Sequence, residues 1–152
     1  MSRFLVAICF VFGLAGAAHG AEILDAGDPN EIHQIASGFG AAELATSNDG
    51  DPLIRGRMSG VRYIVLFYGC TDGVNCRTIQ FYTAFQKQVT DEKMNDWNRT
   101  KRFGRAYRDN EGDAVIEMDV NLFGGVTKKN LDDTFDYYRL VLDEFTSFIE
   151  LR

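Results

Sequence analysis

The sequence contains few of the residues on which metal sites and nucleophilic catalysis depend. Its 152 residues include three cysteines and two histidines, and it has no G-x-S-x-G, no H-E-x-x-H and no glycine-rich phosphate loop. A zinc site at Cys70 and Cys76 would need two further ligands, and His33 is the only histidine after residue 20. We therefore expect no metal, no cofactor and no catalytic residues, and a protein that is not an enzyme.

Apolar runs long enough to cross a membrane are also missing outside the N-terminus. Arg3 precedes the apolar run 4–14 and the small residues 15–18, an order that is typical of a secretory signal peptide over residues 1–20. The run is too short for a permanent anchor; an N-terminal anchor that stays uncut is the alternative. We expect a periplasmic or secreted bacterial protein, without stable membrane insertion after cleavage.

Positive charge is in deficit. The chain has 16 Lys and Arg residues against 22 Asp and Glu residues, a net charge of −6. This balance argues against nucleic acid as a partner and suits an exported protein.

The rest of the chain predicts an exposed leader (21–29) followed by one domain (30–152) with a single core. Cys9 lies in the predicted signal peptide, so Cys70 and Cys76 are the remaining thiols. An even pair in an exported chain indicates a disulfide. The alternative is a redox-active pair, but five residues separate these cysteines, whereas thioredoxin-type motifs have two.

The segment Val61–Phe85 contains two apolar runs, separated by a turn-rich loop with a cysteine at each end. We expect two paired strands at the centre of a sheet, with the disulfide closing their tip. Apolar residues occupy both faces of strand 61–68, which is typical of a central strand covered on both sides. The partner strand places Thr78, Gln80 and Tyr82 on one face, so we expect this chain to cover that side only in part. A second protomer or a ligand could cover the remainder.

Three helices are expected around this sheet. A short helix covers 31–37, a second begins after Thr90 and ends at Gly104, and the last begins after Thr127 or Asn130. The last helix carries apolar residues at steps of four and three, which predicts that it lies across the sheet; a dimer seam between two such helices is the alternative. This stripe consists of Leu131, Phe135, Tyr138, Leu142, Phe145 and Ile149.

The strands are expected as antiparallel hairpins. A meander uses 39–46, 53–58, 61–68 and 78–85, and a second hairpin uses 104–108 and 114–122. Ser59-Gly60 fits a two-residue hairpin loop, and the second hairpin's register sets Arg105 opposite Glu117. The fold class is therefore α+β, an antiparallel sheet of about five or six strands in the order α-β-β-β(-β)-α-β-β-α.

One cluster of charge stands out as a candidate binding site. Five cations and no anion occupy ten residues, and a tryptophan stands beside them. These cations either pair with the acidic outer strand and the last helix, which we favour, or dock an acidic partner. The candidate residues are Trp97, Arg99, Lys101, Arg102, Arg105 and Arg108.

Several runs together carry a family resemblance over about residues 30–150. They are RGRMSGVRYIVLFYGC, C-R-x-x-Q-F, NDWNRTKRFGRAY, DAVIEMDVNLFGGV and YYRLVLDEFTSFI. In these runs the chain resembles the YbjN-domain family, described as bacterial regulators of sensory transduction. That family is similar in fold to type III secretion chaperones, whose protomers often dimerise and bind extended segments of other proteins. The resemblance implies a protein partner and a possible homodimer, and it supplies no catalytic residues.

The resemblance departs from this chain in one respect. Type III secretion chaperones work in the cytoplasm, whereas this chain carries an export signal, so a role in effector secretion is not implied. We expect an exported binding module that is chaperone-like or regulatory and holds a protein segment against its sheet. The alternatives are a small-ligand-binding envelope protein, a thiol–disulfide enzyme using Cys70 and Cys76, and an envelope stability factor.

Overall fold

A computed structural model describes residues 23–24 and 27–150. The predicted signal peptide (1–20) and positions 21–22 and 25–26 of the predicted leader lie outside the described residues. Within the described ranges the chain forms three helices, a six-stranded sheet and a two-stranded ribbon.

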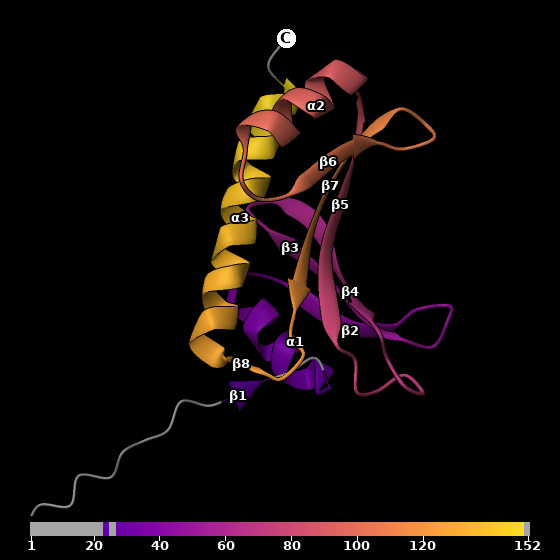
Figure 1. The fold of residues 1–152 in the computed structure, drawn as a ribbon, viewed down its shortest axis with the longest axis vertical. Coiled ribbons are helices and arrows are strands. Elements are labelled where there is room, and N and C mark those ends of the chain that lie inside the picture. Colours follow the sequence, from indigo (N-terminus) through magenta and orange to yellow (C-terminus); the bar gives the residue numbers. More distant parts are fainter. Residues whose placement is uncertain (1–22, 25–26, 151–152) are drawn as a thin grey trace, which may run out of the picture.

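The six-stranded sheet is antiparallel throughout and has the strand order β2-β3-β4-β5-β7-β6 (Figure 1). Its strands are β2 (Ala42–Thr46), β3 (Pro52–Met58), β4 (Val61–Tyr68), β5 (Thr78–Gln88), β6 (Arg105–Arg108) and β7 (Asp113–Asn121). The predicted α+β class and the predicted order of elements are confirmed. The sheet's two halves join where β5 pairs with β7, although a helix and β6 separate these strands in sequence.

The helices begin at polar caps, and two of these caps, Thr90 and Thr127, were among those predicted from the sequence. The Asp28 carboxylate accepts from the Asn30 N–H at 2.9 Å at the start of α1 (Pro29–Gly38). The Thr90 hydroxyl accepts from the Lys93 N–H at 3.2 Å at the start of α2 (Asp91–Thr100). At the start of α3 (Lys128–Glu150), Thr127 is the cap, accepting from the Asn130 N–H at 3.1 Å.

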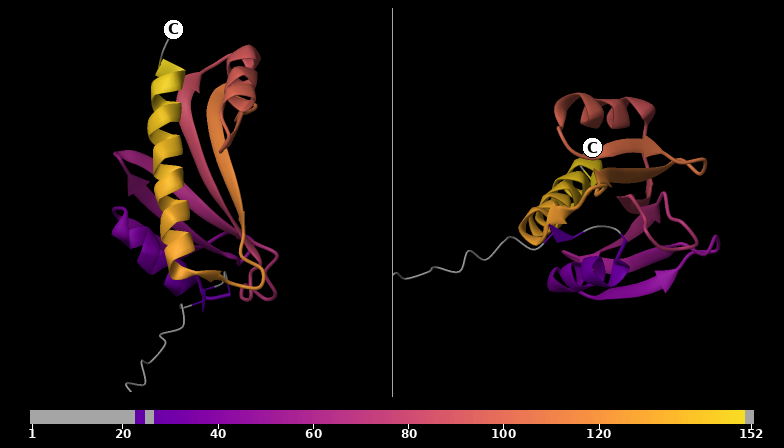
Figure 2. Two further views of the ribbon diagram at one scale, coloured as in Figure 1. Left: turned by 60° about the vertical axis from the view of Figure 1, so that its left-hand side comes forward. Right: turned by 60° about the horizontal axis from the view of Figure 1, so that its bottom comes forward.

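All three helices lie on one face of the sheet (Figure 2). The long helix α3 crosses that face, α1 lies beside β2 and β3, and α2 lies beside β6 at the opposite edge. No helix within residues 23–24 and 27–150 is long and apolar enough to cross a membrane.

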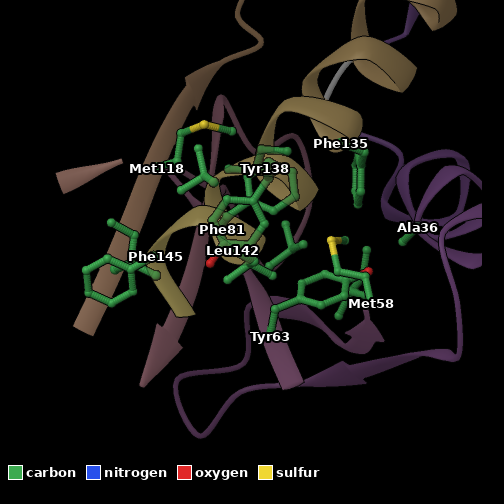
Figure 3. Packing of buried hydrophobic residues seen from close by; sticks show 14 of the residues in the cluster. Ala36, Met58, Tyr63, Phe81, Met118, Phe135, Tyr138, Leu142 and Phe145 are labelled. Carbon is green, nitrogen blue, oxygen red and sulfur yellow. The ribbon is translucent and has the colours of Figure 1, made fainter. Parts of the chain in front are cut away.

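The core lies between α3 and the sheet and is rich in aromatic rings (Figure 3). Every residue of the predicted stripe on α3 is buried. The Phe81 ring of β5 packs between two of them, with its centroid 4.8 Å from that of Phe135 and 4.5 Å from that of Tyr138. Trp97 brings α2 into the same core, since its ring lies 4.9 Å from that of Phe145.

The prediction that β4 is covered on both faces is wrong. Tyr63, Val65 and Phe67 are buried beneath the helices. On the opposite face Ile64 and Leu66 are only half-buried and Tyr68 is 45% exposed. The cause is that all the described helices pack on one side, so this face is shielded only by side chains of neighbouring strands.

The prediction of an exposed leader is wrong at Leu24. Residues Ile23–Leu24 form β1, which pairs with β8 (Val126–Thr127), and Leu24 is buried. Burial of the apolar Leu24 side chain is favourable, whereas Ile23 of the same strand is 61% exposed. The leader's last residue, Pro29, is the first residue of α1.

The two ends of β4 are closed as predicted. At one end Ser59 and Gly60 have φ angles of 49° and 81°, which are the left-handed pair that a two-residue hairpin loop requires. At the other end Cys70 and Cys76 form the predicted disulfide across the tip of the β4–β5 hairpin.

Candidate functional site

The side of the sheet away from the helices, here called the uncovered face, carries a ladder of polar side chains. The Tyr68 hydroxyl donates to Gln80 Oε1 at 3.2 Å, and Gln80 Nε2 donates to Asp119 Oδ1 at 2.8 Å. Thr78, Gln80 and Tyr82 are half-buried. The prediction that this chain covers their side of the sheet only in part is confirmed for the described residues.

At one end of the uncovered face, the register of the strands places side chains in rows that run across the sheet. Directly paired residues of neighbouring strands project to the same face. Glu43, Arg55, Ile64 and Tyr82 are paired in turn across β2, β3, β4 and β5 and form the first row. Arg57 and Arg62 are paired two residues further along β3 and β4. Together with Ala84 of β5 they form the second row.

A groove of about 490 Å³ lies between these rows. The residues between the rows contribute their backbone, because the Tyr63 and Thr83 side chains are buried in the core and Gly56 has none. We call this feature the arginine groove, after the residues that make its two walls. It is defined by Glu43, Arg55, Ile64 and Tyr82 on one wall and by Arg57, Arg62 and Ala84 on the other.

The groove's arginines have no acidic partner in the part of the chain that the structure describes. Arg57 and Arg62 directly oppose each other, and like charges in that position destabilise a sheet. Arg57 donates to the Gly60 carbonyl at 2.6 Å. Arg55 pairs in register with Glu43, but the two form no ion pair. The groove therefore presents three exposed guanidinium groups to solvent.

The buried carboxylate of the uncovered face accepts from two side chains of β6. Glu117 is paired with Arg105, as the sequence predicts, and accepts from the Tyr107 hydroxyl at 2.6 Å. Burial, and next the hydrogen bond to Glu117, raise the pKa of Tyr107. Burial, and next the charges of Asp109 and Glu117, raise the pKa of Tyr82. These two contacts tie Glu117 of β7 to Arg105 and Tyr107 of β6.

The predicted basic cluster lies elsewhere and is largely paired. Its cations meet acids on α2, β7 and α3. The pairs are Arg99 with Asp96 at 2.5 Å, Lys101 with Glu144 at 2.9 Å, Arg105 with Glu117, and Arg108 with Asp91 at 3.7 Å. Lys101 and Arg105 pair with the last helix and the acidic strand, as the favoured interpretation expects. Arg99 and Arg108 pair instead with acids of α2, which was not predicted.

Three members of the cluster do share a surface. Trp97, Lys101 and Arg102 line a hollow of about 280 Å³ beside the exposed Tyr137 and Leu140 of α3. Trp97 itself is buried, and its indole N–H donates to the Gly104 carbonyl at 3.0 Å. Arg105 lies on the uncovered face, apart from these three residues. The cluster therefore does not form a single site. A binding role for the cluster stays a prediction.

Attack by a thiol on a disulfide requires access to a sulfur atom, and Cys70 is half-buried. Cys76 is only 5% exposed and belongs to the core. The pair closes the hairpin tip at the end of β4 away from the arginine groove.

The sequence interpretation missed Arg55, Arg57 and Arg62. A signal was present, because the two-residue loop Ser59-Gly60 determines the register of β3 and β4. That register pairs Met58 with Val61 and hence Arg57 with Arg62. Alternation then places Arg55 on the same face as Arg57.

Comparison with known proteins identifies a family. The model of the YbjN family, described as "Putative bacterial sensory transduction regulator", matches residues 28–151. None of the curated proteins compared with the chain matches it.

Proposed function

The chain belongs to the YbjN family, and we propose on that premise that it is an exported, non-enzymatic regulatory module. It holds a segment of a partner protein against the uncovered face of its sheet. The family description supports a regulatory role. The signal-like residues 1–20 and the disulfide support export.

The observation that carries the proposal is the uncovered face itself. Helices bury one side of β4 and β5, while the other side keeps Ile64, Leu66 and Tyr82 half-buried beside an open groove. Apolar and hydrogen-bonding side chains alternate across this surface, and an extended peptide offers the same two kinds of group. A segment laid over these residues would bury their remaining apolar area at about 25 cal/mol per Å².

The test is site-specific photocrosslinking in native cells. A photoreactive amino acid replaces Ala84, which is exposed in the groove, and a matched variant carries it at Asp133, which is exposed on α3. The captured protein is identified by mass spectrometry and its crosslinked peptide is mapped. We expect one recurrent partner, attached through one short segment, from position 84 only. Equal capture from both positions, or no protein captured from position 84, would refute the proposal.

A small-ligand-binding envelope protein is the second candidate. The groove's volume of about 490 Å³ favours it, because ligand sites commonly measure about 300–1,000 Å³. This candidate predicts that position 84 captures no protein, while a small molecule raises the melting temperature of the purified protein.

A further inference from the structure

We propose that the partner segment is acidic, and that the arginine groove recognises its carboxylates. This inference rests on the proposed function and names the chemistry of the segment. Carboxylates fit because a guanidinium group presents its donors in a planar fork that matches a carboxylate in bidentate geometry.

The first observation is the placement of Arg57 opposite Arg62. A directly opposed pair of like charges costs a sheet stability, typically a few tenths of a kcal/mol up to about 1 kcal/mol. In natural proteins, locally unfavourable arrangements such as this pair of like charges are expected at functional sites. An anion lying between the two guanidinium groups would turn their repulsion into attraction.

The second observation is the contrast with the predicted basic cluster. Acidic residues outnumber basic ones by 22 to 16, and four of the five cations in the predicted basic cluster find an acidic partner. Arg55, Arg57 and Arg62 form no ion pair with any described residue. Among the described residues that line the groove, Glu43 is the one acidic residue, and it forms no ion pair with these arginines.

The third observation is the mixture of charge and apolar surface along the groove. Arg55 lies on one wall, while Arg57 and Arg62 lie on the other, and Ile64, Tyr82 and Ala84 continue both walls towards β5. Neighbouring strands are about 4.8 Å apart and an extended chain advances about 6.8 Å every two residues. A segment that crosses the strands from β2 to β5 meets Glu43 first, then the arginines of β3 and β4, and then Tyr82 and Ala84 of β5.

The test uses two labelled octapeptides, one of alternating threonine and glutamate and one of alternating threonine and glutamine. Fluorescence anisotropy follows their binding to the purified disulfide-bonded protein. We expect the glutamate peptide to bind and the glutamine peptide to bind far more weakly. Arg57→Gln and Arg62→Gln should each weaken binding about fivefold, a value reduced for the exposure of these groups.

Matched variants make the result specific to the groove. Glu43→Gln removes the acid on the groove wall and should tighten binding of the glutamate peptide. Arg99→Gln and Arg102→Gln, in the predicted basic cluster, should leave it unchanged. Arg62→Gln should melt at the same temperature as the wild type or above it, because a repulsive pair is lost.

Three results would overturn the inference. The first is equal binding of the two peptides, and the second is a loss of binding only with Arg99→Gln or Arg102→Gln. The third is displacement of the peptide by free glutamate at equal carboxylate concentration, which would show that the groove binds a small anion. If position 84 captures a partner segment and Arg57→Gln leaves this capture unchanged, the acidic chemistry fails and the proposed function stands. If the peptides behave as expected and position 84 captures no protein, the proposed function fails instead.

Discussion

Two buried tyrosines in the same core differ in how their hydroxyl groups are accommodated. The Tyr138 hydroxyl lies 2.9 Å from Thr83 Oγ1 and forms a hydrogen bond with it. The Tyr63 hydroxyl is buried and has no hydrogen-bond partner among the described residues. Its ring fills the space above Gly56, where an added Cβ would lie 2.3 Å from the ring. Tyr63 thus serves packing beneath the groove at the expense of an unsatisfied hydroxyl.

Removing that hydroxyl should not harm the fold. Tyr63→Phe keeps the ring above Gly56 and removes a buried group whose desolvation costs about 1–3 kcal/mol, so we expect the free energy of unfolding to stay the same or rise. Tyr138→Phe is the matched control and should lose about 1 kcal/mol, because its hydrogen bond to Thr83 disappears. Urea denaturation measures both. A loss in Tyr63→Phe as large as that in Tyr138→Phe would contradict this assignment.

The same residue predicts a loss of stability in alkali. Burial raises the pKa of Tyr63 to about 12, against about 10 for an exposed tyrosine. Between these values the unfolded chain has lost the proton and the folded chain still holds it. The free energy of unfolding therefore falls as the pH rises from about 10 towards 12. Denaturation at a series of alkaline pH values measures the slope. It should be shallower in Tyr63→Phe, and an unchanged slope would be evidence against a raised pKa.

The helix α3 organises the fold at the scale of elements. Its buried stripe covers the sheet's inner face, and its outer face carries exposed apolar residues such as Leu140. Because an α-helix has 3.6 residues per turn, apolar residues at steps of three and four fall on one face, and the residues between them form the other face. The single covered face of the sheet, and so the uncovered face with its groove, follows from the way α3 and its two neighbours pack on one side.

Two leucines on α3 allow the buried and the exposed face of this helix to be compared. Leu142 is fully buried and Leu140 is 45% exposed. We expect Leu142→Ala to cost about 2–5 kcal/mol, from lost burial and the cavity left behind. Leu140→Ala should change stability by less than about 0.5 kcal/mol. Thermal and urea denaturation of both variants measure the difference, and equal costs would show that α3 is packed in another orientation.

The disulfide should act on stability and leave the groove alone. Replacing Cys70 and Cys76 by serine opens a short loop, for which the chain-entropy model gives about 2.4 kcal/mol. The groove is at the opposite end of β4, so binding of the glutamate peptide should persist wherever the variant is folded. Denaturation and fluorescence anisotropy provide the two measurements. Loss of binding in a folded variant would favour the alternative of a functional thiol pair.

At the scale of the whole molecule, local patterns predicted most of the elements and tertiary packing decided the remainder. The α3 stripe, the Thr90 cap and the pairing of Arg105 with Glu117 were predicted correctly, because each depends on periodicity or on one hairpin register. The pairing of β1 with β8 was missed, since two-residue strands far apart in sequence have no periodic pattern. The arginine groove was missed because it belongs to no single element and arises where β2, β3, β4 and β5 meet.

The charge of the whole molecule has the opposite sign to that of its candidate site. The chain carries a net charge of −6, while the arginine groove gathers three exposed arginines without an ion pair in the described part of the chain. The net negative charge of the chain would repel an acidic partner, while the three groove arginines would attract it. Such an arrangement favours one orientation of binding, and added salt should weaken it.

The most direct measurement is an NMR titration of the ¹⁵N-labelled protein with the alternating threonine–glutamate octapeptide. The competing sites, the arginine groove and the predicted basic cluster, are then compared in one experiment. We predict that the amide signals that shift belong to residues around the groove, such as Gly56, Arg62 and Ala84. Shifts confined to residues 97–108, with the groove amides unmoved, would contradict the account.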